Sequence, residues 1–354
     1  MSATSRYDLD RDGWSELLVG EPRFRLEQVW NGLYHQGRDL SELTTLPGPL
    51  RERLAADAPL ALTEVTEAVT DGGDTVKFLW ELEGGARVET VLMHYADRST
   101  VCLSTQAGCA MGCSFCATGQ AGFERHLSTG EIVEQLARAR RRAAEGATPR
   151  RVSNIVFMGM GEPLANYDST WAAIRRIHRD MEIGARHLTV STVGLVPGIL
   201  RMAAEELPVG LAVSLHAADD ELRDELVPIN RTYPLPVLMS ACEEYVEATH
   251  RRLSFEWAMI DGVNDRFVDA ERLAALARPL RAHVNLIPLN PTPGYAVRGS
   301  SGNRVRAFRG ELERLGVNVT VRDTRGTEID AACGQLRAGH EATPVRRPRR
   351  RTTA

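Results

Sequence analysis

Four of the six cysteines in this 354-residue chain lie in one short stretch, CLSTQAGCAMGCSFCATG (102–119). Cys109, Cys113 and Cys116 follow a C-x3-C-x2-C spacing, and Cys102 precedes them. In a reducing compartment, clustered thiols serve as metal ligands or catalysts rather than as disulfides. The stretch therefore predicts a zinc site, an iron–sulfur cluster or, least of all, simple packing.

The spacing of the triplet favours an iron–sulfur cluster over zinc. Structural zinc takes four ligands, usually from two close pairs, and the sequence contains no second C-x2-C pair and no H-x3–5-H pattern. His126 could complete a zinc site, although its spacing is unremarkable. Three thiolates on a cubane cluster leave one iron without a protein ligand. A small molecule could bind that iron and receive an electron.

A second set of candidate residues follows apolar, strand-like runs. In parallel strand–helix folds, ligands gather at the carboxyl ends of the strands. Each residue alone has an ordinary structural explanation, but together they predict a site for a ribose, an amino group or a carboxylate, which glycines such as Gly159 would let the backbone approach closely. The set comprises Gly161 and Glu162 in GMGEP, then Ser191, then Ser214, Leu215 and His216 in SLH, and Asn290 in PLNPTPG.

The elements that would position these residues fall into four segments. Residues 1–60 have helical periodicity and predict a small helical module. Residues 61–98 alternate apolar and polar side chains around DGGD and EGG turns, which predicts an antiparallel β extension. Residues 99–338 alternate strand and helix patterns and form the core, and residues 339–354 read as a basic disordered tail.

The core predicts an α/β fold with a parallel sheet. Six strand–helix units are too few for an eight-fold barrel, so we expect a partial (βα)6 barrel, with a doubly wound open sheet as the second choice. Helices are expected near 128–143, 168–179, 196–206, 237–250, 269–280 and 302–315, the last leading to a strand-like VNVTVRD. The expected strands are Thr100–Ser104, Asn154–Met158, His187–Ser191, Leu211–Leu215, Leu253–Ile260 and His283–Pro288.

Composition indicates a folded protein away from membranes. Hydrophobic residues make up 43% and charged residues 25% of the chain, which supports a sizeable core. No signal peptide and no apolar run long enough to cross a bilayer is evident, so we expect a cytoplasmic location. The net charge of −4 does not by itself indicate a nucleic-acid-binding protein, although residues 138–151 and 346–351 are rich in arginine. Nearly all of the cationic residues are arginines, and Lys77 is the only lysine.

The cysteine spacing, with Phe115 directly before the last cysteine, resembles that of radical S-adenosylmethionine (SAM) enzymes. That resemblance implies one [4Fe–4S] cluster held by Cys109, Cys113 and Cys116, with SAM on the open iron. Over nearly the whole chain the sequence further resembles the adenine-methylating RlmN/Cfr group of radical SAM RNA methyltransferases. The matching segments are RVETVLM (87–93), the cysteine stretch and its continuation, VFMGMGEPLAN, LAVSLHA, NLIPLNP and EIDAACGQL.

The resemblance implies a mechanism that uses thiols outside the cluster. Adenine C2 is electron-poor and will not displace a methyl group from a sulfonium. In this group one SAM methylates the residue matching Cys333, and a radical formed from a second SAM removes a hydrogen from the S-methyl group. The methylene radical adds to the base, Glu89 accepts the ring proton, and Cys102 releases the product by forming a disulfide with Cys333. Without the resemblance, Glu89 would read as a solvent-facing strand residue, and Cys242 reads as core.

The implied substrates are an adenine in the peptidyl-transferase region of 23S rRNA and one beside the anticodon in tRNA. Loop bases can be splayed into a pocket while cationic groups hold the backbone, and the segment 138–151 and the helical module are candidates for that contact. The tail could be an RNA-touching arm or a solvated end. An external donor such as a flavodoxin-type reductant would supply electrons, and we expect a monomer.

Three other functions remain open from the sequence. The first is Cfr-type methylation at adenine C8, which uses the same cysteines and the same cluster. The second is a non-catalytic, zinc-bound RNA-binding module. The third is a radical SAM enzyme acting on a peptide or small metabolite, which would leave Cys333 without a task.

Overall fold

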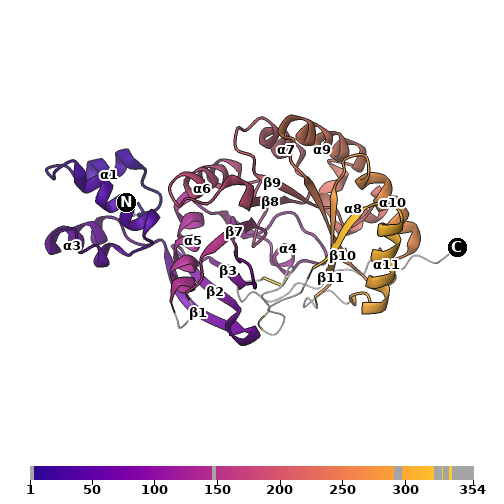
Figure 1. Cartoon of the computed structure of the whole chain (residues 1–354), viewed down its shortest axis with the longest axis horizontal. Helices are drawn as coiled ribbons and strands as arrows, with labels where there is room; N and C mark the ends of the chain where they lie inside the picture. The colour runs from indigo at the N-terminus through magenta and orange to yellow at the C-terminus, as the bar shows by residue number, and fades with distance from the viewer. Residues whose placement is uncertain (1–3, 146–148, 291–296, 323–328, 330–334, 337–354) are drawn as a thin grey trace.

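The computed structural model describes residues 4–145, 149–290, 297–322, 329 and 335–336. Cys333 and the basic tail therefore lie outside the described residues. The chain forms a small helical module, an antiparallel β extension and a parallel α/β core, arranged in that order along the molecule (Figure 1). None of the described helices is long and apolar enough to cross a membrane.

The N-terminal module packs short helices around buried aromatic side chains. Trp14, Leu33 and Tyr34 are fully buried within it, and Trp30 lies 4.5 Å from Tyr34 between ring centroids. Asp10 begins the first helix by accepting a hydrogen bond from the Gly13 amide. The helices are α1 (Arg11–Leu17), α2 (Phe24–Trp30) and α3 (Gly48–Asp57), with a π-helical turn at Asn31–His35 and a 3-10 turn at Leu40–Glu42.

The β extension is continuous with the core sheet. Strands β1 (Leu62–Thr70), β2 (Thr75–Leu82) and β3 (Arg87–His94) pair antiparallel, and β3 then pairs antiparallel with the first core strand, β4 (Ser99–Cys102). Because β3 is bonded on both sides, every side chain from Val88 to His94 is buried. Strands β1, β2 and β3 therefore continue the inner face of the core sheet beyond β4.

The parallel strands follow one another in sequence order, which confirms the barrel-type prediction. A doubly wound sheet would reverse its order part-way, whereas the observed order is β1-β2-β3-β4-β7-β8-β9-β10-β11-β12. In the described part of the chain β1 and β12 form the two edges and do not pair. The remaining core strands are β7 (Val152–Phe157), β8 (Leu188–Thr192), β9 (Gly210–Ser214), β10 (Leu253–Met259), β11 (His283–Pro288) and β12 (Asn318–Val321).

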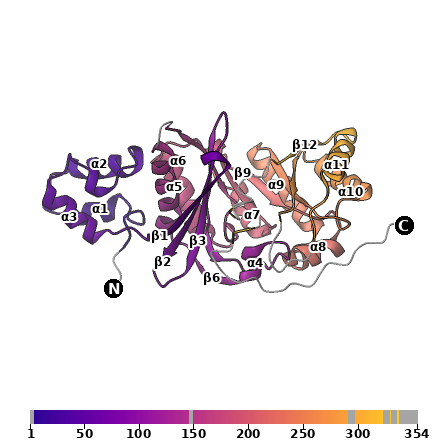
Figure 2. The ribbon, with the colours of Figure 1, turned by 90° about the horizontal axis from the view of Figure 1, so that it is seen from below.

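The helices between these strands cover the outer face of the sheet (Figures 1 and 2). Apolar side chains such as Ile155, Val190 and Val213 are fully buried, while residues one position along each strand face inward. Two further short helices, α4 (Ala117–Ala121) and α8 (Asp220–Leu226), have no counterpart in the sequence prediction. The covering helices are α5 (Thr129–Ala144), α6 (Tyr167–Arg179), α7 (Val196–Ala203), α9 (Leu235–Thr249), α10 (Phe267–Ala277) and α11 (Gly302–Arg314).

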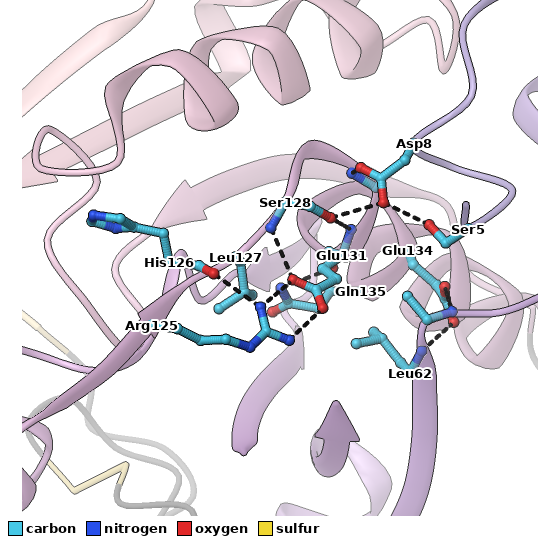
Figure 3. Close-up of polar contacts among 12 residues, drawn as sticks. Ser5, Asp8, Leu62, Arg125, His126, Leu127, Ser128, Glu131, Glu134 and Gln135 are labelled. Carbon is cyan, nitrogen blue, oxygen red and sulfur yellow. Dashed lines mark hydrogen bonds and ion pairs between the residues drawn. The ribbon is translucent and has the colours of Figure 1, made fainter. Parts of the chain in front are cut away.

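Helix α5 connects the N-terminal segments to the core through the partly buried carboxylate of Asp8 and the buried carboxylate of Glu134 (Figure 3). Asp8 accepts hydrogen bonds from the Ser128 hydroxyl at 2.9 Å and from the Gly130 amide at 2.6 Å. Glu134 accepts from the Ala61 amide at 2.8 Å and from the Leu62 amide at 3.2 Å, where β1 begins. The chain on both sides of the helical module is therefore bonded to one helix.

Candidate active site

A cavity of about 150 Å³ lies at the carboxyl ends of the parallel strands. We call it the carboxyl-end cavity. Most of the residues predicted from the sequence to hold a cluster or a cofactor line it, although they come from five different elements. They are Cys109, Cys113, Cys116, Gly161, Glu162, Ser191, Ser214, His216 and Asn290.

The cysteine loop is shaped by close backbone contacts. Strands β5 (Gln106–Gly108) and β6 (Phe123–His126) pair antiparallel on either side of it, and the Cys109 amide donates to the Gly122 carbonyl at 2.7 Å. Gly108 has a φ of +71°, and a Cβ atom there would lie 1.9 Å from the Gly122 oxygen. Only glycine fits this position. His126 bonds Gln106 through its Nδ1 at 3.0 Å and is not among the lining residues.

The three thiols have the properties of ligands for a cluster. Burial raises the pKa of Cys109 to about 12 and raises that of Cys113 as well, and each neighbouring thiolate adds to the effect. A bound cation reverses such costs, because a ligating thiol is deprotonated. Among the described residues no three His, Cys, Asp or Glu side chains are placed to hold a single metal ion. A cubane cluster binds each of its cysteines through a different iron.

The GMGEP segment packs against the start of the cysteine loop. A Cβ atom at Gly159 would lie 2.7 Å from the Leu103 oxygen, and one at Gly161 would lie 2.5 Å from the Gln106 side chain. Both glycines line the cavity, so their predicted role in letting a ligand approach stays a prediction, and the structure adds a second reason for glycine at these positions. Their missing side chains make room for residues 103–106 of the chain itself, which brings Glu162 to the cavity wall.

Glu162 joins two neighbouring strand ends. One carboxylate oxygen accepts from the Leu164 amide at 3.0 Å and the other from the Val193 amide at 2.9 Å, just beyond β8. Burial raises the pKa of Glu162 to about 7, although these hydrogen bonds act in the opposite direction. The side chain is therefore poised between its protonated and ionised forms at the edge of the cavity.

His216 is neutral and has a defined tautomer. Its Nδ1 accepts a hydrogen bond from the Ala258 amide at 3.0 Å, so the ring proton is on Nε2. Burial lowers its pKa to about 3. The backbone at His216 is left-handed, with a φ of +59°, and its ring meets Phe115 edge to face at 4.5 Å between centroids. The ring can donate one hydrogen bond but cannot act as a cation.

Ser191 and Ser214 lie side by side at the ends of β8 and β9, with 3.4 Å between their hydroxyl oxygens. Both hydroxyls line the cavity. Leu215 differs from the other predicted residues, because its side chain is fully buried in the core. Its amide donates to Glu256, and its carbonyl accepts from Ala217 and Arg223.

Comparisons with known proteins identify the family. Residues 103–274 match the model of the radical SAM superfamily. Probable dual-specificity RNA methyltransferases RlmN from Salinispora tropica and Chloroflexus aurantiacus are 52% and 51% identical to this chain, covering 94% and 96% of it and 92% and 94% of the relatives. A crystal structure of a radical SAM methyltransferase from Sphaerobacter thermophilus is 50% identical, has a TM-score of 0.91, and is matched over 95% of this chain and 99% of that one.

This chain belongs to the RlmN family of radical SAM RNA methyltransferases. Membership implies SAM and a [4Fe–4S] cluster as cofactors and RNA as the substrate class. The region matched by the superfamily model contains the whole cysteine loop, the GMGEP segment and the SLH segment. The residues around the carboxyl-end cavity fit those cofactors, because three thiols meet there with compact polar groups from neighbouring strands.

Glu89 and Cys102, which the RlmN resemblance assigns to catalysis, are both buried on the inner face. Val91 pairs with Cys102 across β3 and β4, and Glu89 lies two residues from Val91 on the same side of β3. The interpretation of Glu89 as a solvent-facing residue is wrong, since its side chain is only 4% exposed. Neither residue is among those that line the carboxyl-end cavity.

Lys77 was noted in the sequence, but no role was predicted for it. It is the only lysine in the chain, and its Nζ lies 3.2 Å from the Glu89 carboxylate, with side chains that are 15% and 4% exposed. Lys77 pairs with Val91 across β2 and β3, so Lys77, Val91 and Cys102 form one row across three strands. A single lysine among many arginines was the signal that could have drawn attention to it.

Arg223 was also missed and is fully buried beneath the cavity. Its guanidinium donates to the Val193 oxygen at 2.6 Å, the Leu215 oxygen at 3.1 Å and the Asn230 side chain at 2.8 Å. It thereby holds together the ends of β8 and β9, which carry the two cavity serines. Burial lowers its pKa to about 10. An isolated arginine in DELRDEL gives no sequence signal for this role.

The arginine-rich segment 138–151 is largely engaged inside the molecule. Arg141 bonds Glu42 of the helical module at 2.6 Å, and Arg142 bonds Glu67 of β1 at 3.0 Å. Arg140 donates to the Tyr34 carbonyl at 3.3 Å. These arginines join α5 to the N-terminal segments, which leaves less of their charge for RNA than the sequence suggested.

Proposed function

We propose that this chain methylates C2 of adenine in RNA, with an adenine in the peptidyl-transferase region of 23S rRNA and one beside the anticodon of tRNA as substrates. The observation that carries the proposal is the placement of Glu89 and Cys102 on one buried face of β3 and β4, beside the cluster loop. A carboxylate and a thiol so placed supply the proton acceptor and the resolving sulfur that this chemistry requires. Family membership supports the RNA substrate class.

The cofactors would be held at the carboxyl-end cavity. Cys109, Cys113 and Cys116 would hold the cluster, which together with SAM supplies an electron and a 5′-deoxyadenosyl radical when bound. Neutral His216, with its proton on Nε2, can donate to a ribose oxygen or a carboxylate of the cofactor. The other proposed SAM-contacting residues are Gly161, Glu162, Ser191, Ser214, Leu215 and Asn290.

Three side chains of this protein would carry the methyl transfer. Cys333, outside the described residues, accepts a methyl group as a thiolate and then bonds to the adenine carbon through its S-methylene group. Glu89 accepts the proton that leaves the ring carbon. The thiolate of Cys102 attacks the Cys333 sulfur, so that a disulfide forms as the carbon–sulfur bond breaks. The carbon keeps the electron pair of that bond and takes up a proton, which completes the methyl group on the base. An external reductant, such as a flavodoxin-type protein, then restores the two thiols.

Lys77 would keep Glu89 ready for that role. An ammonium group at 3.2 Å favours the ionised form of a carboxylate, and only the ionised form can accept a proton. The bond also fixes the direction of the carboxylate along the row that contains Cys102. In this proposal Lys77 is a positioning residue that acts through Glu89.

Mass spectrometry of the RNA and of the protein tests the proposal. In a strain from which the gene for this protein has been deleted, rRNA and tRNA should lose 2-methyladenosine. In the purified enzyme, the peptide that contains Cys333 should carry an S-methyl group. Loss of an 8-methyl base instead would assign the Cfr-type reaction. Full turnover by a Cys333→Ala variant would disprove the methyl-carrier mechanism while leaving the cluster assignment intact.

A Cys102→Ala variant gives the sharper mechanistic test. It should form the covalent protein–RNA product but fail to release it, which a denaturing gel would detect as a shifted band.

We further propose that the protein acts as a monomer in the cytoplasm, where its RNA substrates are found. Sedimentation of the protein alone and with RNA tests the monomer.

A further inference from the structure

A second cavity, of about 550 Å³, lies on the same inner face of the sheet and nearer the amino ends of the strands. We call it the amino-end cavity. It shares Met158, Glu256 and Arg322 with the lining of the carboxyl-end cavity. The two cavities therefore adjoin, and together they span the interior of the core from one end of the strands to the other.

The strand register shows how the two cavities are stacked. Thr189 and Asn285 line the amino-end cavity, whereas Ser191 and Ile287, two residues further along the same strands, line the carboxyl-end cavity. Side chains two residues apart share one face of a strand. The amino-end cavity thus continues the inner surface by about one pleat toward the opposite end of the core.

Cys102 lies at the level where the cavities meet. It pairs with Val156 across β4 and β7, and Val156 and Thr100 both line the amino-end cavity. Glu89 lies on the adjoining strand, on the same face. Neither Cys102 nor Glu89 is among the described residues that line the amino-end cavity, but each shares the inner face of its strand with a residue that does, Cys102 with Thr100 and Glu89 with Met93. A group that enters through this cavity would therefore come close to the faces of β3 and β4 that carry the two proposed catalytic side chains.

The mouth of the amino-end cavity is cationic and carries an aromatic ring. Arg98, Arg186 and His187 line it and are exposed. Within the described part of the chain Arg186 makes no ion pair, unlike Arg141 and Arg142 of α5. The Arg98 guanidinium lies 4.4 Å from the Tyr95 ring centroid and also bonds its neighbour Asp97 at 3.0 Å.

Glu256, the one acid among the described residues of this lining, does not cancel the positive charge at the mouth. Glu256 is buried, and its oxygens accept from Asn285 at 2.7 Å and Ser254 at 3.1 Å. Burial raises its pKa, which favours the neutral form. Exposed arginines beside an aromatic ring are the usual surface for a nucleic-acid strand, since they bind phosphates while a base stacks.

We infer that the substrate RNA strand enters the core from the amino ends of the strands. Arg98 and Arg186 bind its backbone phosphates, and the extruded adenine passes Tyr95 and the amino-end cavity to reach Glu89 and Cys102. This inference rests on the proposed function. The two ends of the core would then bind different ligands, since the cofactors occupy the carboxyl-end cavity and the RNA enters at the opposite end.

Binding of a fluorescent RNA hairpin with an unpaired adenine tests the entrance. The Arg98→Ala/Arg186→Ala double variant should bind about 10- to 100-fold more weakly than the wild type, and the slope of log Kd against log salt should fall by about 2, or about 1 per lost phosphate contact. Arg175→Ala is the matched control, since Arg175 is exposed on α6 and pairs with Glu205. It should bind as the wild type does.

A bulky side chain introduced into the amino-end cavity provides a second test, in which RNA methylation is measured. Thr320 lines the amino-end cavity from the edge strand β12 and is exposed, so Thr320→Trp should narrow the passage without disturbing the core. We expect it to lose most RNA methylation while forming 5′-deoxyadenosine from SAM, without RNA, at the wild-type rate. Unchanged methylation by Thr320→Trp, or unchanged RNA affinity of the double variant, would disprove the inferred RNA entrance but leave the proposed function standing. Absence of any RNA binding by the wild type would overturn the proposed function as well.

Discussion

Glu162 and Glu134 have nearly the same local chemistry in two different regions of the molecule. Each is buried, each accepts hydrogen bonds from two backbone amides, and burial raises the pKa of each to about 7. Glu162 borders the carboxyl-end cavity, whereas Glu134 holds the start of β1 against α5. A shifted pKa therefore marks a buried acid, and only the adjoining cavity distinguishes a functional one.

Glu89 extends this comparison, because it is a third buried glutamate and has a cation rather than two amides as its described partner. Lys77 compensates for the burial of Glu89 by its charge. Glu162 instead relies on backbone amides, and Glu134 combines two backbone amides with Arg138 at 3.6 Å. The difference fits a carboxylate that must be ionised in order to accept a proton. The following substitutions test whether the three glutamates differ in the way that their surroundings indicate.

The largest effect is expected for Glu89→Gln. A general base contributes about 10²- to 10⁴-fold to a rate, so methylation should fall by that factor while the covalent protein–RNA product accumulates. Quench-flow methylation assays and denaturing gels measure both. Glu81→Gln is the control, since Glu81 lies on the same hairpin in an exposed pair with Arg87. Equal losses in the two variants would argue against a catalytic Glu89.

Lys77→Met should slow methylation by about 10-fold, which corresponds to about 1.4 kcal/mol. The variant removes the ammonium group that lies 3.2 Å from the Glu89 carboxylate. Lys77→Arg, which keeps the charge, should recover part of the rate. The comparison variant is Arg87→Met on the adjoining strand, and thermal unfolding reports any structural loss. If Lys77→Arg recovered none of the rate, Lys77 would be confined to a structural role.

Glu162→Gln should weaken SAM binding by about 10-fold, because the amide cannot carry the charge that faces the cofactor site. It also leaves one of the two backbone amides without an acceptor, which costs about 1–3 kcal/mol of unfolding free energy. Equilibrium dialysis with SAM measures the affinity. Glu134→Gln suffers the same backbone loss outside the cavity, so SAM should bind it normally. Equal SAM affinities in both variants would remove the distinction between the two acids.

The smallest effect on activity is expected for Glu134→Gln, which should lower the stability and also reduce its dependence on pH. The folded protein keeps a proton on Glu134 up to about pH 7, whereas the unfolded chain releases it near pH 4.5. Glu134 thus favours folding most below pH 4.5, and this contribution is lost as the pH rises to about 7. Denaturant unfolding at pH 5 and pH 8 measures how much the unfolding free energy falls between the two pH values. That fall should be about 1–3 kcal/mol smaller in the variant than in the wild type.

Much of the architecture was predictable from the sequence. The six core strands and their helices were expected close to where they occur, because apolar periodicity depends on local side-chain order. Cys242 was expected in the core and is fully buried. The short elements around the cysteine loop, β5, β6 and α4, were not predicted, because five residues or fewer carry too little periodicity.

The site was predictable as a list of residues but not as a set of contacts. Motif and spacing identified the cysteines and the strand-end residues that now line one cavity. They could not reveal that Gly159 and Gly161 make room for residues 103–106, or that Arg223 joins two strand ends. Those facts depend on neighbours far apart in the chain, and a single sequence does not contain pairwise distances.

The sequence by itself determined the chemistry available to this protein, because thiol spacing and strand-end polar residues are properties of local order. The tertiary structure decided which of its charged side chains serve that chemistry. It paired the only lysine with Glu89, engaged the arginines of α5 in the scaffold, and left Arg186 at the mouth of a cavity. The physical reason is that burial and charge pairing are set by long-range packing, which brings β2, β3 and β4 into one register.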